Sequence, residues 1–463
     1  MVQGRKKTIQ VLGISGTFMA GLAVIAKQLG YSVSGHDTAC YSPMKEQLSS
    51  HGISVTIGYD EALPVADLYI IGNSISRGNP FLETILVQGL PYCSGPEWLY
   101  REVLVDKWVM AVAGTHGKTT TTSMLAWIME RAGHNPSFLI GGIAENFGCS
   151  ARLTDSDLFI IEADEYDTAY FDKRPKFMHY RPKTLVVNNM EFDHADIYSD
   201  LEAIKQQFHY LIRTVPADGS VIYADEDVNI REVLTRGCWS KRQGFGEKSQ
   251  TDGWYFSDQD GYQSFTVGYA GQGIADVKWG LQGIHNASNA VAAIAAANHY
   301  GVSTHQGAAA LRQFQGVKRR LEHKGTVAGI VFYDDVGHHP TAIAKVLGSL
   351  RHKLAKHAKV ISMVELGSYT IRSGVMADHL YDALLLSDRV VLLNPASQSD
   401  FDWREWVVDK PHIVIADSDE AICDNVVEYA TAGDVVISFS SRNFHAIHAT
   451  LRQRLLQTSE RVR

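Results

Sequence analysis

The residues with the clearest chemical potential form a glycine-rich stretch between an apolar run at 108–113 and a helical pattern from about 119 to 132. The stretch consists of Gly114, Thr115, His116, Gly117, Lys118, Thr119 and Thr120. Glycines let successive backbone N–H groups face a phosphate, Lys118 can reach the β and γ oxygens of a nucleotide, and the Thr119 hydroxyl can bind Mg²⁺. Only two residues separate Gly114 from Gly117, so an incidental glycine turn is the alternative. We predict that these seven residues, called the phosphate loop below, bind ATP.

Carboxylates and a histidine follow two further apolar runs. Residues 162–167 read EADEYD, and residues 188–196 read NNMEFDHAD. Because the carboxyl ends of parallel strands meet at one edge of a sheet, both clusters are expected beside the phosphate loop. Oxygen ligands suit Mg²⁺, so Glu162 joins Thr119 as a predicted ligand, and His194 either binds a metal or orients a substrate oxygen. Either cluster alone would be read as a solvated loop, and no HExxH or Cys/His spacing indicates zinc.

A second glycine-rich turn follows the apolar run at 8–12. It contains Gly13, Ser15, Gly16, Thr17, Phe18 and Met19, and Asp37 ends the next strand-like run. The arrangement resembles diphosphate recognition in dinucleotide folds, but Ser15 and Phe18 stand where GxGxxG has its second and third glycines. Tight packing of a strand against a helix is an equal alternative. If the turn binds a nucleotide, a UDP-sugar is as reasonable as NAD.

Later polar residues supply further candidates. Asn286 and Asn289 come just before an alanine-rich helix, which either of them could cap, and the functional alternative places Asn286 near an adenine. Arg320 either closes over ATP as a cation on the transferring phosphate or belongs to a solvated basic run. Asp335 and His338 are either polar residues at a helix start or nucleotide contacts. Four more candidates follow strands in the last third of the chain: Ser368, Thr370, Arg372 and Arg442. The two arginines among them are suited to bind a peptide carboxylate.

The elements that must position these residues alternate between short β-rich runs and helical patterns in three series. The first series starts at residue 8, the second at 108 and the third at 330. Between about 238 and 279, short alternating runs rich in Gly, Asp, Gln, Ser and aromatic residues predict β-hairpins beside the middle series. We predict three α/β domains: an N-terminal Rossmann-like domain at 1–106, a central P-loop ATPase-type domain with a mixed sheet at 107–316, and a C-terminal Rossmann-like domain at 317–463.

Composition places the chain among ordinary globular proteins. Of its residues, 45% are hydrophobic and 20% are charged. With 463 residues, the chain is too long for one ordinary domain. The formal net charge of −8 gives little support to nucleic-acid binding, although local donors can hold anionic metabolites. Five scattered cysteines without a CxxC pair indicate reduced thiols, and neither a secretory segment nor a membrane span is apparent. We therefore expect a cytoplasmic protein that binds no nucleic acid and no membrane.

Five motifs together resemble those of the Mur ligases, the amide-forming enzymes of peptidoglycan synthesis. They are GTHGKTTT at 114–121, EADEYD at 162–167, NNMEFDHAD at 188–196, HNASNA at 285–290 and DDVGHHPT at 334–341. The resemblance spans nearly the whole chain. It implies that the first domain holds a UDP-muramyl substrate, the middle one ATP and Mg²⁺, and the last one nucleotide and the incoming amine.

The resemblance also implies roles for individual residues. The implied catalytic residues are Lys118, Glu162, His194 and Arg320, with Thr119, Glu162 and His194 at the metal. The residues implied to join the phosphate loop at ATP are Asn286, Asn289, Arg320, Asp335 and His338. The residues implied for the UDP-sugar are Gly13, Ser15, Gly16, Thr17, Phe18, Met19, Asp37, Asn73 and Ser74. The residues implied for the peptide acceptor are Ser368, Thr370, Arg372 and Arg442.

Within the family, segments at 16–23, 41–44, 77–80 and 365–374 look more like the members that attach a whole tripeptide in murein recycling than like those that add L-alanine. The implied reaction joins L-Ala-γ-D-Glu-meso-diaminopimelate to UDP-N-acetylmuramate through an acyl phosphate, with ATP as cosubstrate and Mg²⁺ as cofactor. Ligation of L-alanine is the alternative within the family. A P-loop kinase and a noncatalytic nucleotide-sugar sensor are rivals from other classes. A monomer or weak homodimer is expected.

Overall fold

The structure is a computed structural model that describes residues 6–247, 253–355, 357–394, 399, 401–440 and 444–461. The chain falls into two compact units. The first unit comprises Met1–Phe192, Asp200–Leu281 and Asn286–Val317. The second comprises Asp193–Ser199, Gln282–His285 and Lys318–Arg463. Within the described part of the chain, no helix is both long and apolar enough to cross a membrane.

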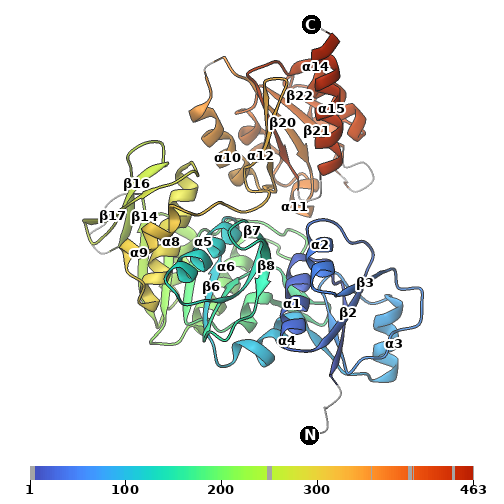
Figure 1. Cartoon of the computed structure of the whole chain (residues 1–463), viewed down its shortest axis with the longest axis vertical. Coiled ribbons are helices and arrows are strands. Elements are labelled where there is room, and N and C mark those ends of the chain that lie inside the picture. The colour runs from blue at the N-terminus through green and yellow to red at the C-terminus, as the bar shows by residue number, and fades with distance from the viewer. Residues whose placement is uncertain are drawn as a thin grey trace. The chain divides into compact units, whose positions relative to one another are not determined.

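The first unit begins with a five-stranded parallel sheet in the order β3-β2-β1-β4-β5, drawn in blue in Figure 1. Its strands are β1 Thr8–Leu12, β2 Ser32–Asp37, β3 Ser54–Ile57, β4 Leu68–Ile71 and β5 Tyr92–Ser94. Its helices are α1 Thr17–Gln28, α2 Met44–Ser50, α3 Pro80–Gln88 and α4 Gly95–Leu99, with the π-helical turn η1 Tyr100–Leu104 after them. The strand order reverses at β1, which has β2 on one side and β4 on the other. Open parallel sheets bind ligands at such a switch point, beyond the carboxyl ends of the strands.

A ten-stranded mixed sheet forms the larger part of the first unit, in the order β17-β16-β15-β14-β13-β12-β6-β9-β7-β8 (Figure 1). Its strands are β6 Trp108–Ala113, β7 Ser137–Ala144, β8 Cys149–Arg152, β9 Leu158–Glu162, β12 Thr184–Val187, β13 Ser220–Ala224, β14 Lys241–Gly246, β15 Trp254–Asp258, β16 Ser264–Tyr269 and β17 Gln272–Lys278. Its helices are α5 Lys118–Arg131, α6 Leu201–Thr214, α7 Val228–Thr235, α8 Ile284–Tyr300 and α9 Thr304–Leu311. A separate antiparallel pair, β10 Asp167–Ala169 and β11 Asp172–Pro175, leads into the 3-10 turn η2 Lys176–His179. The strands from β15 to β7 pair in parallel, and antiparallel pairs extend both edges of the sheet.

The helix that follows β6 is buried from its first turn, although its sequence is rich in hydroxyl groups. Buried hydroxyls must find hydrogen-bond partners, and here the helix backbone supplies them. The Thr122 and Ser123 hydroxyls donate to the carbonyls of Lys118 and Thr119, each at 2.7 Å. The apolar side chains of α5 join those of the alanine-rich α8 and of β6, β7 and β9 in one core. The first turn of α5 is therefore fixed by packing on a rigid sheet.

The second unit contains a six-stranded sheet in the order β18-β19-β23-β20-β21-β22. Its strands are β18 Glu322–Val327, β19 Ile330–Asp335, β20 Val360–Glu365, β21 Arg389–Leu393, β22 Ile413–Ala416 and β23 Val435–Phe439. Its helices are α10 Pro340–Lys353, α11 Tyr369–Arg372, α12 Ala377–Leu384, α13 Trp403–Trp406, α14 Asp419–Tyr429 and α15 His445–Arg461. All pairs are parallel except the edge pair β18–β19. Alternate strand residues face two apolar cores, one shared with α10 and α12 and the other with α14 and α15.

The predicted fold class is confirmed, because two largely parallel α/β sheets flank a mixed central sheet along the chain. The β-hairpins predicted at 238–279 are present as β15, β16 and β17. Several short strands were not predicted, among them β7, β10 and β11, because glycines or charged residues interrupt their apolar patterns. The domain boundaries near residues 106 and 316 stay predictions.

Candidate active site

The phosphate loop connects β6 to α5 and depends on two glycines. Gly114 and Gly117 have φ angles of 135° and 81°, a backbone region that residues with side chains rarely adopt. A Cβ at Gly114 would lie 3.1 Å from the backbone N and O of Asn189, and a Cβ at Gly117 would lie 2.9 Å from Asn289 Oδ1. Both positions therefore need glycine for the backbone angle and for space. The structure also brings the predicted nucleotide residue Asn289 against this loop.

Asn189, in the segment that follows strand β12, holds the phosphate loop in shape. The amide of Asn189 accepts from the His116 N–H and donates to the His116 carbonyl, both at 2.9 Å. The His116 ring pairs with the Glu191 carboxylate at 2.8 Å. The preceding residue, Asn188, donates from its Nδ2 to the Thr121 hydroxyl of α5 at 2.8 Å. The two asparagines, which the sequence analysis treated only as part of an acidic cluster, are thus supports of the loop.

Lys118 lies among carboxylates at the first turn of α5. Its Nζ is 2.6 Å from Glu165 Oε2 and 3.7 Å from Asp164 Oδ1. Lys118 and Glu165 are both buried, at 9% and 2% exposure. Burial acts to lower the pKa of Lys118, but the carboxylates of Glu165, Asp164 and Glu162 outweigh it and raise the pKa above its ordinary value. Lys118 is therefore a permanent cation at the first turn of α5, where the sequence predicts that a nucleotide phosphate binds.

Thr119 and Glu162 come together from α5 and the end of β9, as predicted from the carboxyl-end rule. The Thr119 hydroxyl donates to Glu162 Oε1 at 3.1 Å, and the Gly141 N–H donates to Glu162 Oε2 at 2.8 Å. A Cβ at Gly141 would lie 2.5 Å from that oxygen, so only glycine leaves room for the carboxylate. Gly141 of β7 is a supporting residue that sequence reasoning missed.

The turns after β1 and β4 meet at the switch point of the N-terminal sheet. Gly13 has a φ of 77°, and a Cβ there would lie 2.9 Å from the Ser74 hydroxyl. Asp37 holds the turn from the end of β2, because its two carboxylate oxygens accept from the N–H groups of Ser15 and Thr38, each at 2.8 Å. The structure thus brings Gly13, Ser15, Asp37 and Ser74 together.

The remaining residues predicted for the UDP-sugar flank this turn. Gly16 is the N-cap of α1, Thr17 begins the helix, and Asn73 lies inside the turn after β4 that the Ile75 N–H closes on the Gly72 carbonyl. Phe18 and Met19 approach Gly95, where a Cβ would lie 3.0 Å from Phe18 Cε1 and from Met19 Sδ. These two side chains therefore pack against the start of α4.

In the second unit, predicted residues from two motifs gather around Asp193. Burial acts to raise the pKa of the Asp193 carboxyl, but His194, His338 and His339 together with a backbone N–H outweigh burial and lower it. Burial lowers the pKa of His338, although Asp193 acts in the opposite direction. His194 has a φ of 55°, and its N–H donates to Asp193 Oδ1 at 2.7 Å. His194 belongs to this unit, whereas Thr119 and Glu162 belong to the first. The metal site predicted from these three residues therefore stays a prediction.

Arg320 sits in a loop whose backbone is unusual on both sides. Arg319 and Leu321 have φ angles of 60° and 49°. Arg319 Nε donates to Asp334 Oδ2 at 3.1 Å, and its Nη2 donates to the Ser440 carbonyl at 2.7 Å. Asp335, a predicted nucleotide contact, is buried and accepts from the Leu321 N–H at 2.7 Å. Asp335 therefore orders the loop that carries Arg320.

Three of the four residues predicted for the peptide acceptor lie around α11. Ser368 is its N-cap and accepts from the Ile371 N–H. The Thr370 hydroxyl accepts from the Ala195 N–H at 2.9 Å, which places it beside the Asp193–Ser199 segment. Arg372 Nη1 donates to the Gly367 carbonyl at 3.4 Å. The fourth residue, Arg442, lies outside the described residues.

The capping alternative for Asn286 and Asn289 is wrong. Helix α8 already begins at Ile284, after Gly283 with a φ of 83°, so both asparagines lie inside the helix. Asn289 is buried and faces the phosphate loop, where Asn188 Nδ2 donates to its Oδ1 at 3.5 Å. The earlier start was hidden because no Ser, Thr, Asp or Asn precedes the helix.

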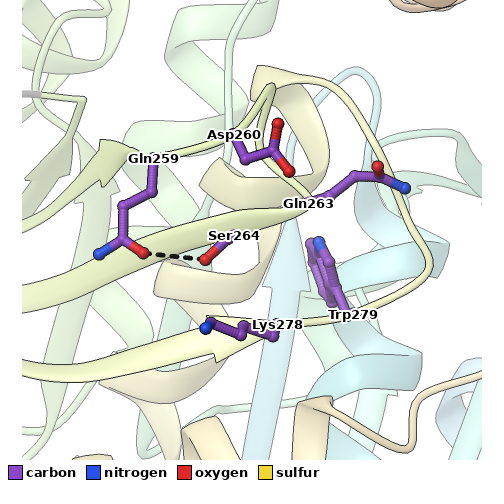
Figure 2. Close-up of a pocket in the computed structure, with 6 residues that line it drawn as sticks. All are labelled: Gln259, Asp260, Gln263, Ser264, Lys278 and Trp279. Carbon is purple, nitrogen blue, oxygen red and sulfur yellow. Dashed lines mark hydrogen bonds between the residues drawn. The ribbon is translucent and has the colours of Figure 1, made fainter.

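A cavity of about 440 Å³ lies on the antiparallel edge of the central sheet (Figure 2). It is lined by Gln259, Asp260, Gln263, Ser264, Lys278 and Trp279. The Ser264 hydroxyl donates to Gln259 Oε1 at 2.8 Å, and Trp279 Nε1 donates to the Tyr262 carbonyl at 2.8 Å. None of the lining residues belongs to the predicted sites, so this cavity is separate from the phosphate loop.

Comparison with known proteins explains why these motifs occur together. Residues 8–103 match the model described as Mur ligase family, catalytic domain, residues 112–297 match the Mur ligase middle domain, and residues 319–442 match the Mur ligase, glutamate ligase domain. The chain belongs to the Mur ligase family. Membership makes it an ATP-dependent ligase, as the sequence resemblance implied.

Individual Mur ligases match over nearly the whole chain. The Escherichia coli (strain K12) protein named UDP-N-acetylmuramate–L-alanyl-gamma-D-glutamyl-meso-2,6-diaminoheptandioate ligase is 44% identical over 98% of this chain and 99% of its own. The crystal structure of a murein peptide ligase from Psychrobacter arcticus is 37% identical, covers 98% of both chains and superposes with a TM-score of 0.78. A UDP-N-acetylmuramate–L-alanine ligase from Geotalea uraniireducens is 31% identical over 98% of this chain and 99% of its own.

Proposed function

We propose that this Mur ligase joins the tripeptide L-Ala-γ-D-Glu-meso-diaminopimelate to UDP-N-acetylmuramate, with conversion of ATP to ADP and phosphate, in peptidoglycan recycling. The observation that carries the proposal is a phosphate loop with Lys118 and the Thr119–Glu162 pair, in a chain 44% identical over nearly its full length to a ligase named for this reaction. The lower identity of 31% to an L-alanine ligase disfavours the alternative acceptor.

The proposed chemistry has two steps. A carboxylate oxygen of the muramyl lactyl group attacks the γ-phosphorus of ATP, the bond to the bridging oxygen breaks, and ADP leaves. The terminal amine of the tripeptide then attacks the acyl phosphate carbonyl, and phosphate leaves as the amine loses a proton. Negative charge spreads over the transferring oxygens in the first step, so Lys118 and the loop N–H groups stabilise it in place. The acyl phosphate would hydrolyse in water, which favours a closed site.

The Thr119–Glu162 pair fits a magnesium ion by its donor chemistry. Both side chains offer hard oxygen atoms, which Mg²⁺ prefers. The two oxygens lie 3.1 Å apart, close to the roughly 3 Å between adjacent ligands of an octahedral ion with bonds of about 2.1 Å. When bound, Mg²⁺ supplies charge that neutralises the phosphate oxygens. Glu162 and Thr119 would hold it, and His194 is proposed as a further metal or substrate contact.

The other predicted residues complete the proposal. Support for the UDP-sugar site comes from the turns after β1 and β4, where Gly13, Ser15, Asp37 and Ser74 meet. Arg320 is proposed as the cation that reaches the transferring phosphate, and Thr370 and Arg372 as contacts of the peptide. We further infer a three-domain division at 1–106, 107–316 and 317–463, a cytoplasmic site of action, and a monomer or weak homodimer.

An isotope experiment tests the two-step chemistry. UDP-N-acetylmuramate labelled with ¹⁸O in its lactyl carboxylate is incubated with ATP, Mg²⁺ and the tripeptide, and product and phosphate are analysed by mass spectrometry. The expected products are the UDP-muramyl tripeptide and phosphate that carries one ¹⁸O atom. Phosphate without the label would contradict the acyl phosphate, and absence of the tripeptide product would contradict the proposed ligation.

A further inference from the structure

A second lysine reaches the carboxylate cluster, which consists of Glu162, Asp164, Glu165 and Asp167, from a segment outside the sequence motifs. The hairpin β10–β11 folds back on residues 162–167 and ends in η2, whose first residue is Lys176. The Lys176 N–H donates to the Tyr166 carbonyl at 3.0 Å, and the Phe177 N–H donates to the Asp164 carbonyl at 3.3 Å. Phe177 is fully buried and packs on Phe208 of α6. Lys176 is therefore held rigidly beside the cluster.

The two lysines make their shortest contacts with different carboxylates of this cluster. Lys176 Nζ is 2.8 Å from Asp164 Oδ2, while Lys118 Nζ is 3.7 Å from Asp164 Oδ1 and 2.6 Å from Glu165 Oε2. The side chain of Lys176 is 9% exposed and lies 5.2 Å from the centre of the Tyr166 ring. Asp164 thus makes its direct ion pair with Lys176, and Lys118 makes its own with Glu165.

We propose that Lys176 is a positioning residue for ATP binding, because it holds Asp164 away from Lys118. The inference rests on the proposed function, in which Lys118 binds the phosphates of ATP. To do so, Lys118 must exchange Glu165 for phosphate oxygens. Without Lys176, the Asp164 carboxylate needs to move only from 3.7 Å into direct contact to become a second competitor for the same ammonium. Oppositely charged groups at hydrogen-bond distance in a buried site attract strongly, so ATP would then displace two carboxylates instead of one.

Replacement of Lys176 by methionine tests this role, because methionine keeps most of the volume and removes the charge. The expected result is a KM for ATP raised roughly tenfold, with kcat at saturating ATP and the KM for UDP-N-acetylmuramate nearly unchanged. Lys176→Arg, which keeps the charge, is expected to retain the KM of the original protein. Lys173→Met is the matched control, because Lys173 lies on the same hairpin, pairs with Asp167 at 2.6 Å and is 70% exposed.

The decisive measurement is the double variant Lys176→Met/Asp164→Asn. If Lys176 acts by restraining the Asp164 carboxylate, the double variant no longer has a charge at residue 164 that competes for Lys118. Its KM for ATP is then expected to return toward the original value. An unchanged KM in Lys176→Met, or a double variant whose KM is no better, would overturn the inference. Urea midpoints report folding, and Lys176→Gln replaces the methionine variant if that one does not fold. Failure of the proposed function is distinguishable, because the unmodified protein would then show no ATP turnover dependent on UDP-N-acetylmuramate.

Discussion

Replacement of Lys118 by methionine is expected to lower ADP release by about a thousandfold. The reason is the position of its ammonium at the first turn of α5, directly after the glycines of the phosphate loop. In the proposed mechanism, negative charge builds up there on the transferring phosphate. Steady-state kinetics with UDP-N-acetylmuramate and the tripeptide measure the loss. Lys183→Met is the control. Lys183 directly precedes β12, at the amino ends of the parallel strands and so away from the phosphate loop, and it pairs with Asp218. The control variant is expected to stay within roughly twofold of the original turnover.

The same substitution also affects folding, and the two effects can be separated. Removal of the Lys118 ammonium leaves the buried Glu165 carboxylate without its ion pair, at a cost of about 3 kcal/mol in the free energy of unfolding. The double variant Lys118→Met/Glu165→Gln removes both charges and is expected to recover stability without recovering activity. Urea denaturation and ADP release follow the two properties. Recovery of activity in the double variant would show that Lys118 serves the fold and not the phosphate.

Replacement of Glu162 by glutamine is expected to lower kcat by about a hundredfold and to raise the Mg²⁺ concentration needed for half-maximal activity. The amide keeps the size of the side chain and can still accept from the Gly141 N–H, but it is a neutral and weaker ligand. Titration of ADP release with MgCl₂ measures both changes. The control is Glu130→Gln, because Glu130 lies at the other end of α5 and pairs with Arg152. If Glu162→Gln kept the Mg²⁺ dependence of the original protein, Glu162 would not be a metal ligand.

The geometry of the candidate phosphate loop could be predicted from the sequence because its parts follow general rules. A strand, two glycines, a lysine and a helix follow one another from Trp108 to Arg131, so a local sequence pattern was enough to mark the loop. Glu162 lies 43 residues after Thr119, yet the two meet because β6 and β9 pair in parallel and both end at the same edge. The carboxyl-end rule was therefore sufficient to join them.

The supporting residues could not be predicted, because their roles depend on contacts that no local pattern encodes. Gly141 and Lys176 lie in segments with interrupted patterns, and they reach the site only through the register of β7 against β9 and the fold of a short hairpin. Asn189 lay in a motif read as acidic, but its side chain binds the backbone of His116. The sequence signal that could have marked Lys176 is a lysine close after a cluster of four carboxylates.

The most direct test of the proposed function compares two acceptors of the muramyl group. ADP release is measured with ATP, Mg²⁺ and UDP-N-acetylmuramate, in the presence of either L-Ala-γ-D-Glu-meso-diaminopimelate or L-alanine. Turnover is expected to depend on both UDP-N-acetylmuramate and the tripeptide, with little turnover on L-alanine. Efficient turnover with L-alanine and none with the tripeptide would contradict the proposed function.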